Sequence, residues 1–85
     1  MHYVYVLLCS DDKFYIGRSS DLRRRLREHQ NGQVKSTKGR RPLKLIFYEA
    51  FQSPADASRR ERYFKTTSGK RALKLMLREY LKGLS

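Results

Sequence analysis

The stretch from Tyr3 to Asn31 contains most of the side chains that could take part in chemistry. It reads YVYVLLCSDDKFYIGRSSDLRRRLREHQN, with several phenols, one imidazole and a run of arginines. Phenol and imidazole groups accept and deliver protons, and a guanidinium binds anionic oxygens with its planar fork. These groups suit acid–base chemistry on an anionic substrate, provided that the fold brings them together.

Two strands are expected at the start of this stretch. Tyr3–Cys9 is an almost continuous run of tyrosine, valine and leucine, which is typical of a strand buried on both faces. Ser10–Lys13 are turn formers, so Phe14–Arg18 should return antiparallel as a hairpin. Gly17 permits a close backbone approach or an unusual dihedral where the second strand leads into a helix.

The length of the hairpin loop decides whether two tyrosines can share a site. In an antiparallel pair, Tyr5 and Tyr15 lie on the same face only if the numbers of paired residues add up to an even number. A loop of Ser10, Asp11 and Asp12, with Cys9 opposite Lys13, satisfies this condition. We predict this odd-numbered loop; an even-numbered loop would put the two phenols on opposite faces.

A basic amphipathic helix should follow the hairpin. Residues 19–21 are good N-caps, and the helical pattern begins at Leu22. At about 100° per residue, one stripe of the helix carries Leu22, Arg25, Leu26 and His29. The stripe faces the sheet, where an unpaired charge is costly. Arg25 and His29 are therefore candidates for function. The alternative is that the arginine stem packs along the core edge while the histidine is an ordinary, hydrogen-bonded core residue.

The second half of the chain predicts one more strand and two more helices. Gln33–Arg41 is rich in Lys, Arg, Ser, Thr and Gly, and we interpret it as a mobile basic loop. Leu43–Phe51 has apolar residues on both faces of a third strand. A helix should begin at Pro54 after the Ser53 cap and end near Lys65. A last helix is expected from about Gly69 to Leu81.

Glu61 lies on the apolar, inward-facing stripe of the helix expected from Pro54 to about Lys65, together with Ala57 and Phe64. A carboxylate in this position is a candidate functional group. Spacing alone slightly favours a plain alternative, in which Glu61 forms a surface ion pair with one of the arginines at positions 59, 60 and 62.

These elements predict the fold class. Their order is ββαβαα, which corresponds to an α/β (α+β) domain with a three-stranded, mainly antiparallel sheet flanked by three helices. With 85 residues the chain has room for one modest core, so we expect a single domain over residues 1–85.

Basic residues dominate the charge of the chain. Lys and Arg number 20 against 8 Asp and Glu, for a formal net charge of +12. Such an excess repels itself, so an anionic partner is expected. Nucleic acid is favoured over a membrane, because the basic residues are spread through the folded elements. Solubility alone does not require all of this charge to have one sign.

The cysteine content and the lack of long apolar segments restrict the kind of protein further. Cys9 is the only cysteine, so neither a disulfide framework nor a zinc cluster can form within one chain. No apolar run approaches the length needed to span a membrane, and the first residues lack the pattern of a signal peptide. We therefore expect a cytoplasmic protein that does not engage membranes.

Several of these residues match a known signature. Tyr3-Val4-Tyr5 looks like a degenerate first half of the GIY-YIG motif, and Tyr15-Ile16-Gly17 matches the second half as written. The arginine ten residues later is Arg25, the histidine one helical turn on is His29, and the glutamate of a later helix is Glu61. The chain thus resembles the GIY-YIG nuclease superfamily, most closely its small stand-alone bacterial members. Tyr3 departs from the pattern, which often has glycine there.

The resemblance implies an activity and a role for each residue. It implies a metal-dependent endonuclease that hydrolyses DNA phosphodiester bonds, with Glu61 holding Mg²⁺ or Mn²⁺. Tyr5 would be the general base, and Tyr15 its hydrogen-bonding or phosphate-contacting partner. Arg25 would contact a phosphate oxygen, and His29 would orient a tyrosine or accept the proton. One active site would nick a single strand, with structure-selective cleavage as a further expectation. We expect a monomer, with a dimer as the alternative.

Seven basic residues are predicted to contact nucleic acid: Arg18, Arg24, Lys35, Lys38, Arg40, Lys65 and Lys70. Two other functional classes stay open. A non-catalytic nucleic-acid-binding module would contact phosphates through Lys35, Lys38, Arg40, Lys70 and Lys74, and would stack exposed aromatic residues on bases. A protein-binding adaptor is less well supported, because no large apolar surface stripe is left once the core is assigned.

Overall fold

An antiparallel sheet forms the middle layer of the computed structural model, which describes residues 1–84. Its three strands are β1 (His2–Leu8), β2 (Phe14–Ser19) and β3 (Lys44–Phe51). Their order across the sheet is β2-β1-β3, so β1 pairs on both sides, while β2 and β3 each pair only with β1. This confirms the predicted three-stranded antiparallel sheet.

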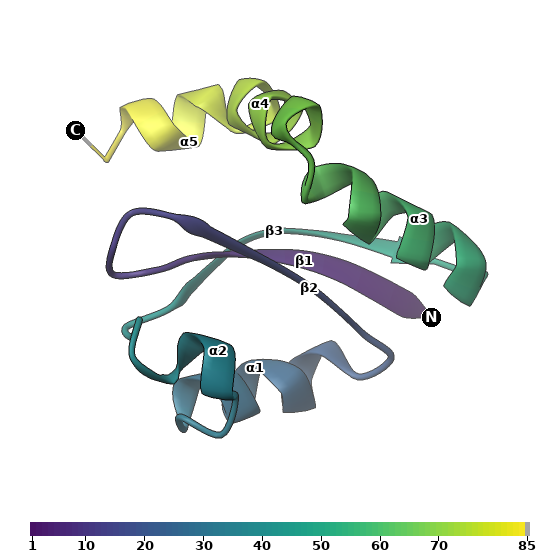
Figure 1. Ribbon diagram of the computed structural model, residues 1–85, viewed down its shortest axis with the longest axis horizontal. Coiled ribbons are helices and arrows are strands. Elements are labelled where there is room, and N and C mark those ends of the chain that lie inside the picture. The colour runs from purple at the N-terminus through teal and green to yellow at the C-terminus, as the bar shows by residue number, and fades with distance from the viewer. Residues whose placement is uncertain (85) are drawn as a thin grey trace.

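Helices cover both faces of the sheet (Figure 1). On one face lie α1 (Leu22–Gln30) and the single-turn α2 (Lys35–Lys38). On the other lie α3 (Pro54–Phe64), α4 (Thr67–Met76) and α5 (Arg78–Lys82). The sheet therefore separates the helix that carries Arg25 and His29 from the helix that carries Glu61.

The main apolar core lies between the sheet and the α3–α4 pair. Six buried side chains form it: Val4, Val6, Ile16, Ala57, Phe64 and Leu73. Because side chains alternate along a strand, the residues between the two valines of β1 point to the opposite face. Tyr5 and Leu7 are buried there beneath α1, each about 1% exposed. The first strand is thus buried on both faces, as its apolar run predicts.

The hairpin has the predicted odd-numbered loop. Tyr5 pairs with Gly17 and Leu7 with Tyr15, so the paired numbers have an even sum. Cys9 donates its amide to the Lys13 carbonyl at 3.0 Å, and Asp12 adopts a φ of 62°. A turn followed by one left-handed residue is a standard three-residue hairpin connection. Tyr5 and Tyr15 consequently lie on the same face.

Two segments differ from the expectation drawn from sequence. The predicted mobile loop over Gln33–Arg41 contains α2, with Val34 and Thr37 buried. The polar composition of this segment gave no sign of a buried helical turn. Its two buried residues are a single valine and a threonine that forms hydrogen bonds inside the protein. The predicted helix from Gly69 to Leu81 is two helices, α4 and α5. α4 begins at Thr67 after the Thr66 cap and ends at Met76, and its C-cap Leu77 has a φ of −106° and a ψ of 17°.

Gly69 allows α4 to pack closely against the end of α3. It is buried, and its amide is held by the Thr66 hydroxyl at 3.0 Å. A β-carbon at this position would collide with the carbonyl of Tyr63, which is backbone and cannot easily move. The glycine therefore permits the close approach of the two helices.

Candidate active site

A buried chain of hydrogen bonds links β1, α1 and α2. The Tyr5 hydroxyl lies 2.8 Å from His29 Nε2, and His29 Nδ1 lies 2.7 Å from Thr37 Oγ1. The Thr37 hydroxyl in turn donates to the Val34 carbonyl at 3.4 Å. The side chains of His29 and Thr37 are fully buried. A histidine fixed at both ring nitrogens can receive a proton at one defined atom.

The hydrogen bond between Thr37 and the Val34 carbonyl decides which atoms donate and which accept along this series of hydrogen bonds. A carbonyl only accepts, so the Thr37 hydroxyl uses its proton on Val34 and accepts from Nδ1–H of His29. Nε2 is then unprotonated and accepts from the Tyr5 hydroxyl. Burial, with a smaller contribution from the Arg25 charge, lowers the pKa of His29 below its usual 6.5. The imidazole is therefore neutral near pH 7 and is the acceptor for Tyr5.

The phenol of Tyr5 crosses directly over Gly17, its partner on β2. A β-carbon at Gly17 would collide with the Tyr5 ring and hydroxyl. The sequence predicted that another group could approach Gly17 closely, and in the structure that group is the Tyr5 side chain. Burial raises the pKa of Tyr5 to about 12, although a hydrogen bond from Arg25 acts in the opposite direction. Tyr5 is thus protonated when no substrate is bound.

Tyr15 completes an aromatic cluster around the imidazole. Its ring centroid lies 5.1 Å from that of His29, edge to face, and 6.4 Å from that of Tyr5. Tyr5 itself meets His29 edge to face at 5.6 Å. The two tyrosines and the histidine singled out in the sequence therefore form one group.

Arg25 lies at the side of this group, with its side chain 36% exposed. Its guanidinium donates to Glu28 Oε1 at 3.0 Å and also hydrogen-bonds the Tyr5 side chain, and these two bonds raise the pKa of Arg25. The arginine therefore keeps an exposed face beside a buried phenol. This is the arrangement required to bind an anion next to Tyr5.

Glu61 reaches the same region from the opposite layer. Its carboxylate pairs with Arg18 on β2 at 3.4 Å and with Lys65 at 3.2 Å, and it is 18% exposed. The alternative drawn from sequence, an ion pair between Glu61 and an arginine at position 59, 60 or 62, was wrong about the partners. Arg60, for example, pairs with Glu49 at 2.8 Å. Glu61 is close enough to Tyr5 for its charge to raise the pKa of that phenol. The residues thus converge across the β2 side of the sheet.

A family model described as the GIY-YIG catalytic domain matches residues 1–74. The chain belongs to the GIY-YIG family.

Small proteins of similar length resemble this GIY-YIG chain over most of their sequence. UPF0213 protein SSP2268 of Staphylococcus saprophyticus is 41% identical over 76 residues, which cover 88% of this chain and 93% of the relative. UPF0213 protein YazA of Bacillus subtilis is 41% identical over 71 residues, or 82% and 72% of the two chains. The solution NMR structure of UPF0213 protein BH0048 from Bacillus halodurans has a TM-score of 0.58 and 37% identity, and the match covers 88% of this chain and 83% of that chain.

The basic residues predicted to bind nucleic acid fall into two groups in this GIY-YIG domain. Four of them form ion pairs: Arg18 and Lys65 with Glu61, Arg24 with Glu28, and Arg40 with Asp11. The other three, Lys35, Lys38 and Lys70, are exposed and form no ion pair within residues 1–84. Their positions on α2 and α4 place positive charge on both helical layers.

Sequence reasoning missed Thr37. It lies eight residues after His29 in a segment interpreted as a mobile loop, and no motif or periodicity marks it. The only available signal was chemical: a buried histidine needs a partner at each ring nitrogen. That rule requires a partner without identifying it.

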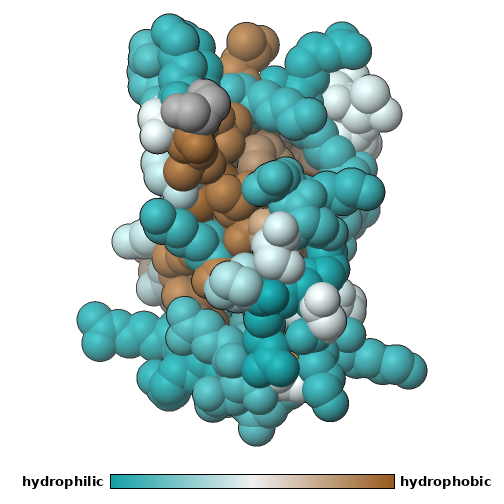
Figure 2. Space-filling model, turned by 90° about the vertical axis from the view of Figure 1, so that its left-hand side faces the viewer, coloured by the Kyte–Doolittle hydropathy of each residue, from teal (hydrophilic) through white to brown (hydrophobic). Residues whose placement is uncertain are grey.

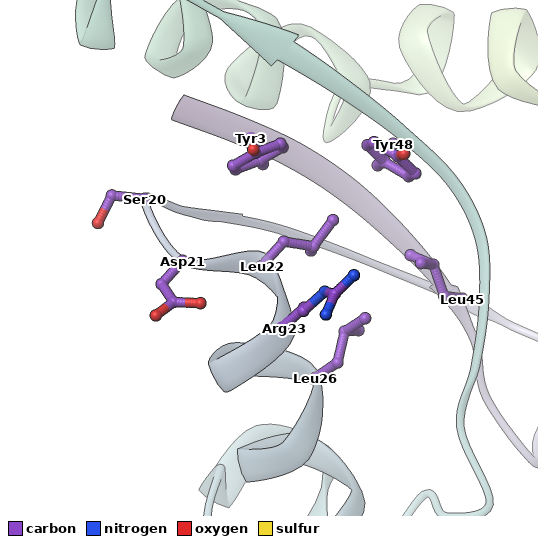
Figure 3. Close-up of a pocket in the computed structure, with 8 residues that line it drawn as sticks. All are labelled: Tyr3, Ser20, Asp21, Leu22, Arg23, Leu26, Leu45 and Tyr48. Carbon is purple, nitrogen blue, oxygen red and sulfur yellow. The ribbon is translucent and has the colours of Figure 1, made fainter. Parts of the chain in front are cut away.

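A hollow on the α1 face of the sheet lies apart from these residues. It has a volume of about 570 Å³ and lies between the start of α1 and the β1–β3 pair (Figure 3). Tyr3 and Tyr48, with ring centroids 6.2 Å apart, lie over Leu22 and Leu26 there. None of the five candidate catalytic residues lines it; these are Tyr5, Tyr15, Arg25, His29 and Glu61. The candidate site therefore lies on the β2 side of the sheet, apart from this hollow.

The buried imidazole predicts that stability falls in mild acid. The folded protein disfavours protonated His29, so the unfolded chain binds more protons below its pKa of about 6.5. The contribution of His29 is complete above about pH 6.5 and is lost as the pH falls towards the lower folded pKa. We expect the free energy of unfolding to decrease by at most about 1.4 kcal/mol per pH unit in that window.

Urea unfolding at several pH values between about 7.5 and 5 measures this slope. A His29→Gln variant should show a flatter dependence, and NMR titration of the His29 ring in the wild type gives the folded pKa directly. A ring that titrates at or above 6.5 in the folded protein would contradict the expectation.

Proposed function

We propose that this GIY-YIG domain is a metal-dependent endonuclease that hydrolyses DNA phosphodiester bonds and nicks one strand at a time. The observation that carries the proposal is the directed hydrogen-bond chain from Tyr5 through His29 to Thr37, with Arg25 and Glu61 beside it. If His29 had only a structural role, it would not need the Tyr5 phenol held next to the exposed guanidinium of Arg25. The net charge of +12 supports a nucleic-acid substrate.

The chain suggests how a water molecule becomes a nucleophile. A phenol whose pKa is about 12 is a poor base while it keeps its proton. Tyr5 can nevertheless accept a proton from water if it passes its own proton to Nε2 of His29, 2.8 Å away. Water loses one proton, Tyr5 ends neutral, and the histidine becomes an imidazolium whose Nδ1–H stays bonded to Thr37. Tyr5 is therefore the base that water meets, and His29 stores the proton.

Arg25 and Tyr15 are assigned to the phosphate. The exposed side of the Arg25 guanidinium can donate to a non-bridging oxygen, whose negative charge grows in the transition state. Tyr15 packs against His29 and presents its phenol on the same face as Tyr5. It supports the imidazole and is available to the substrate. Both residues keep the phosphorus next to the phenol of Tyr5.

Glu61 is the proposed ligand of Mg²⁺ or Mn²⁺. Residues 1–84 contain no cluster of three or more His, Cys, Asp and Glu side chains that could hold a metal by themselves. A single, partly exposed carboxylate fits a hard cation that takes one or two carboxylates and completes its shell with water and substrate phosphate. When bound, the ion would neutralise charge on the phosphate and the leaving oxygen. Arg18 and Lys65, which hold the carboxylate, would have to release it.

Cleavage of labelled DNA tests the proposal. Single-stranded, duplex and branched DNA, and RNA of the same sequence, are incubated with Mg²⁺, with Mn²⁺ and with chelator. We expect DNA cleavage only with a divalent metal, and nicks before double-strand breaks on a supercoiled plasmid. Binding that weakens with salt, but without cleavage of any substrate under any metal condition, would instead establish a non-catalytic nucleic-acid-binding module.

A further inference from the structure

Four cationic side chains converge on a pocket at the hairpin end of the molecule. The pocket has a volume of about 380 Å³. Its lining comes from the hairpin, the segment before β3 and one face of α4: Asp12, Lys13, Phe14, Arg40, Lys70 and Lys74. Figure 2 views the molecule from this end, where hydrophilic side chains border a hydrophobic band. None of the five residues of the candidate active site lines the pocket.

The charges in this pocket are poorly balanced. Arg40 is paired with Asp11 at 3.0 Å, but Lys13, Lys70 and Lys74 form no ion pair with any described residue from 1 to 84. Lys70 and Lys74 are one helical turn apart on the same face of α4, where like charges repel. Only one carboxylate, that of Asp12, lines the space. A folded chain that gathers unpaired ammonium groups around a concavity is suited to an anion.

The position of the pocket relates it to the candidate active site. Phe14 at its rim and Gly17 beneath Tyr5 belong to the same strand, β2. Three residues of a strand span about 10 Å. A stacked nucleic-acid strand advances roughly 3.4 Å per nucleotide, so this length corresponds to about three nucleotides. Because β2 is an outer strand of the sheet, a substrate can lie along its free edge between the two places.

We propose that this pocket is a phosphate-binding subsite, which holds a backbone phosphate of the nucleic acid about three nucleotides from the bond that is cut. The inference rests on the proposed function for its ligand. Lys70, Lys74 and Lys13 bind the phosphate oxygens, while Arg40 is fixed by Asp11 and supports the wall of the pocket. The subsite fixes the register of the strand along β2 and sets a minimum substrate length, without reading sequence.

Thermal unfolding with inorganic phosphate tests the anion site without nucleic acid. The Lys70→Gln/Lys74→Gln variant removes two charges from the pocket. The matched control, Arg62→Gln/Arg71→Gln, removes two exposed charges from α3 and α4 outside it. At equal ionic strength, phosphate should raise the Tm of the wild type and of the control more than chloride does. It should not do so for the pocket variant.

Binding of fluorescent oligonucleotides in chelator tests the spacing. The pocket variant should bind a hexanucleotide about fivefold more weakly than the wild type near 0.1 M salt, with a salt slope smaller by about 0.7, as for the loss of one phosphate contact. A dinucleotide should bind both proteins equally. If the pocket variant and the control behave alike in either experiment, the subsite is wrong. Because neither experiment requires cleavage, a failure of the proposed nuclease activity would be seen separately.

Discussion

Replacing Glu61 by glutamine is expected to lower the rate of metal-dependent DNA cleavage on the order of 10³-fold, while the protein stays folded and bound to DNA. Glutamine keeps the shape of the side chain and removes the charge that a hard cation requires. Loss of one charge-stabilising group from a site of this kind typically lowers the rate by about 10²–10³. The side chain is partly exposed and lies outside the apolar core, so the fold should tolerate the change.

The measurement is single-turnover cleavage at saturating protein, with DNA affinity measured separately in chelator. Affinity should be unchanged or slightly higher, because a negative charge is removed near the phosphates. Glu79→Gln is the matched control, since Glu79 is 80% exposed and lies on α5 away from the candidate site. Wild-type rates in Glu61→Gln would mean that the metal is held elsewhere or that the activity belongs to a contaminant.

Replacing Gly17 by alanine is expected to reduce cleavage about 100-fold through the displacement of Tyr5. The new methyl group would occupy the space of the phenol, so the ring must move off its bond to His29. A misplacement of about 1 Å at a reacting group can lower the rate by about 10². The crowding should also reduce the free energy of unfolding by roughly 1–3 kcal/mol.

Gly39→Ala is the control for this prediction, because nothing lies within 4 Å of the β-carbon it would carry and its φ is −84°. It should leave cleavage and Tm unchanged. The His29 ring resonance in NMR spectra reports the loss of the Tyr5 bond directly in Gly17→Ala. Unchanged cleavage in a folded Gly17→Ala protein would contradict the role of the Tyr5 position.

Local rules were enough to predict the parts of the site that lie close together in sequence. Alternation along β1 and the loop count of the hairpin placed Tyr5 and Tyr15 on one face. The helical period of α1 aimed His29 at that face, where it is fully buried. Each inference used contacts within about thirty residues and geometry that varies little among proteins.

Tertiary contacts decided the rest. The partners of Glu61 come from β2 and from its own helix, and spacing did not distinguish them from the nearby arginines. Thr37 is buried and is the second hydrogen-bond partner of His29, although its own neighbours in sequence are polar. The helix break at Leu77 carries no glycine or proline to mark it, and the structure offers no simple physical reason for its place.

Selection is expected to act differently on the buried part of the candidate site, which contains His29, and on the part that contains Glu61. His29 fills the interior, so most changes there disturb packing and are removed by selection for a folded protein. Glu61 is a partly exposed side chain outside the apolar core, and we expect the domain to fold without it. Under the proposed function, loss of this carboxylate would therefore leave a folded, basic domain without its metal ligand. On that proposal, the residue at position 61 is a better indicator of retained cleavage in a relative than the tyrosine motif is.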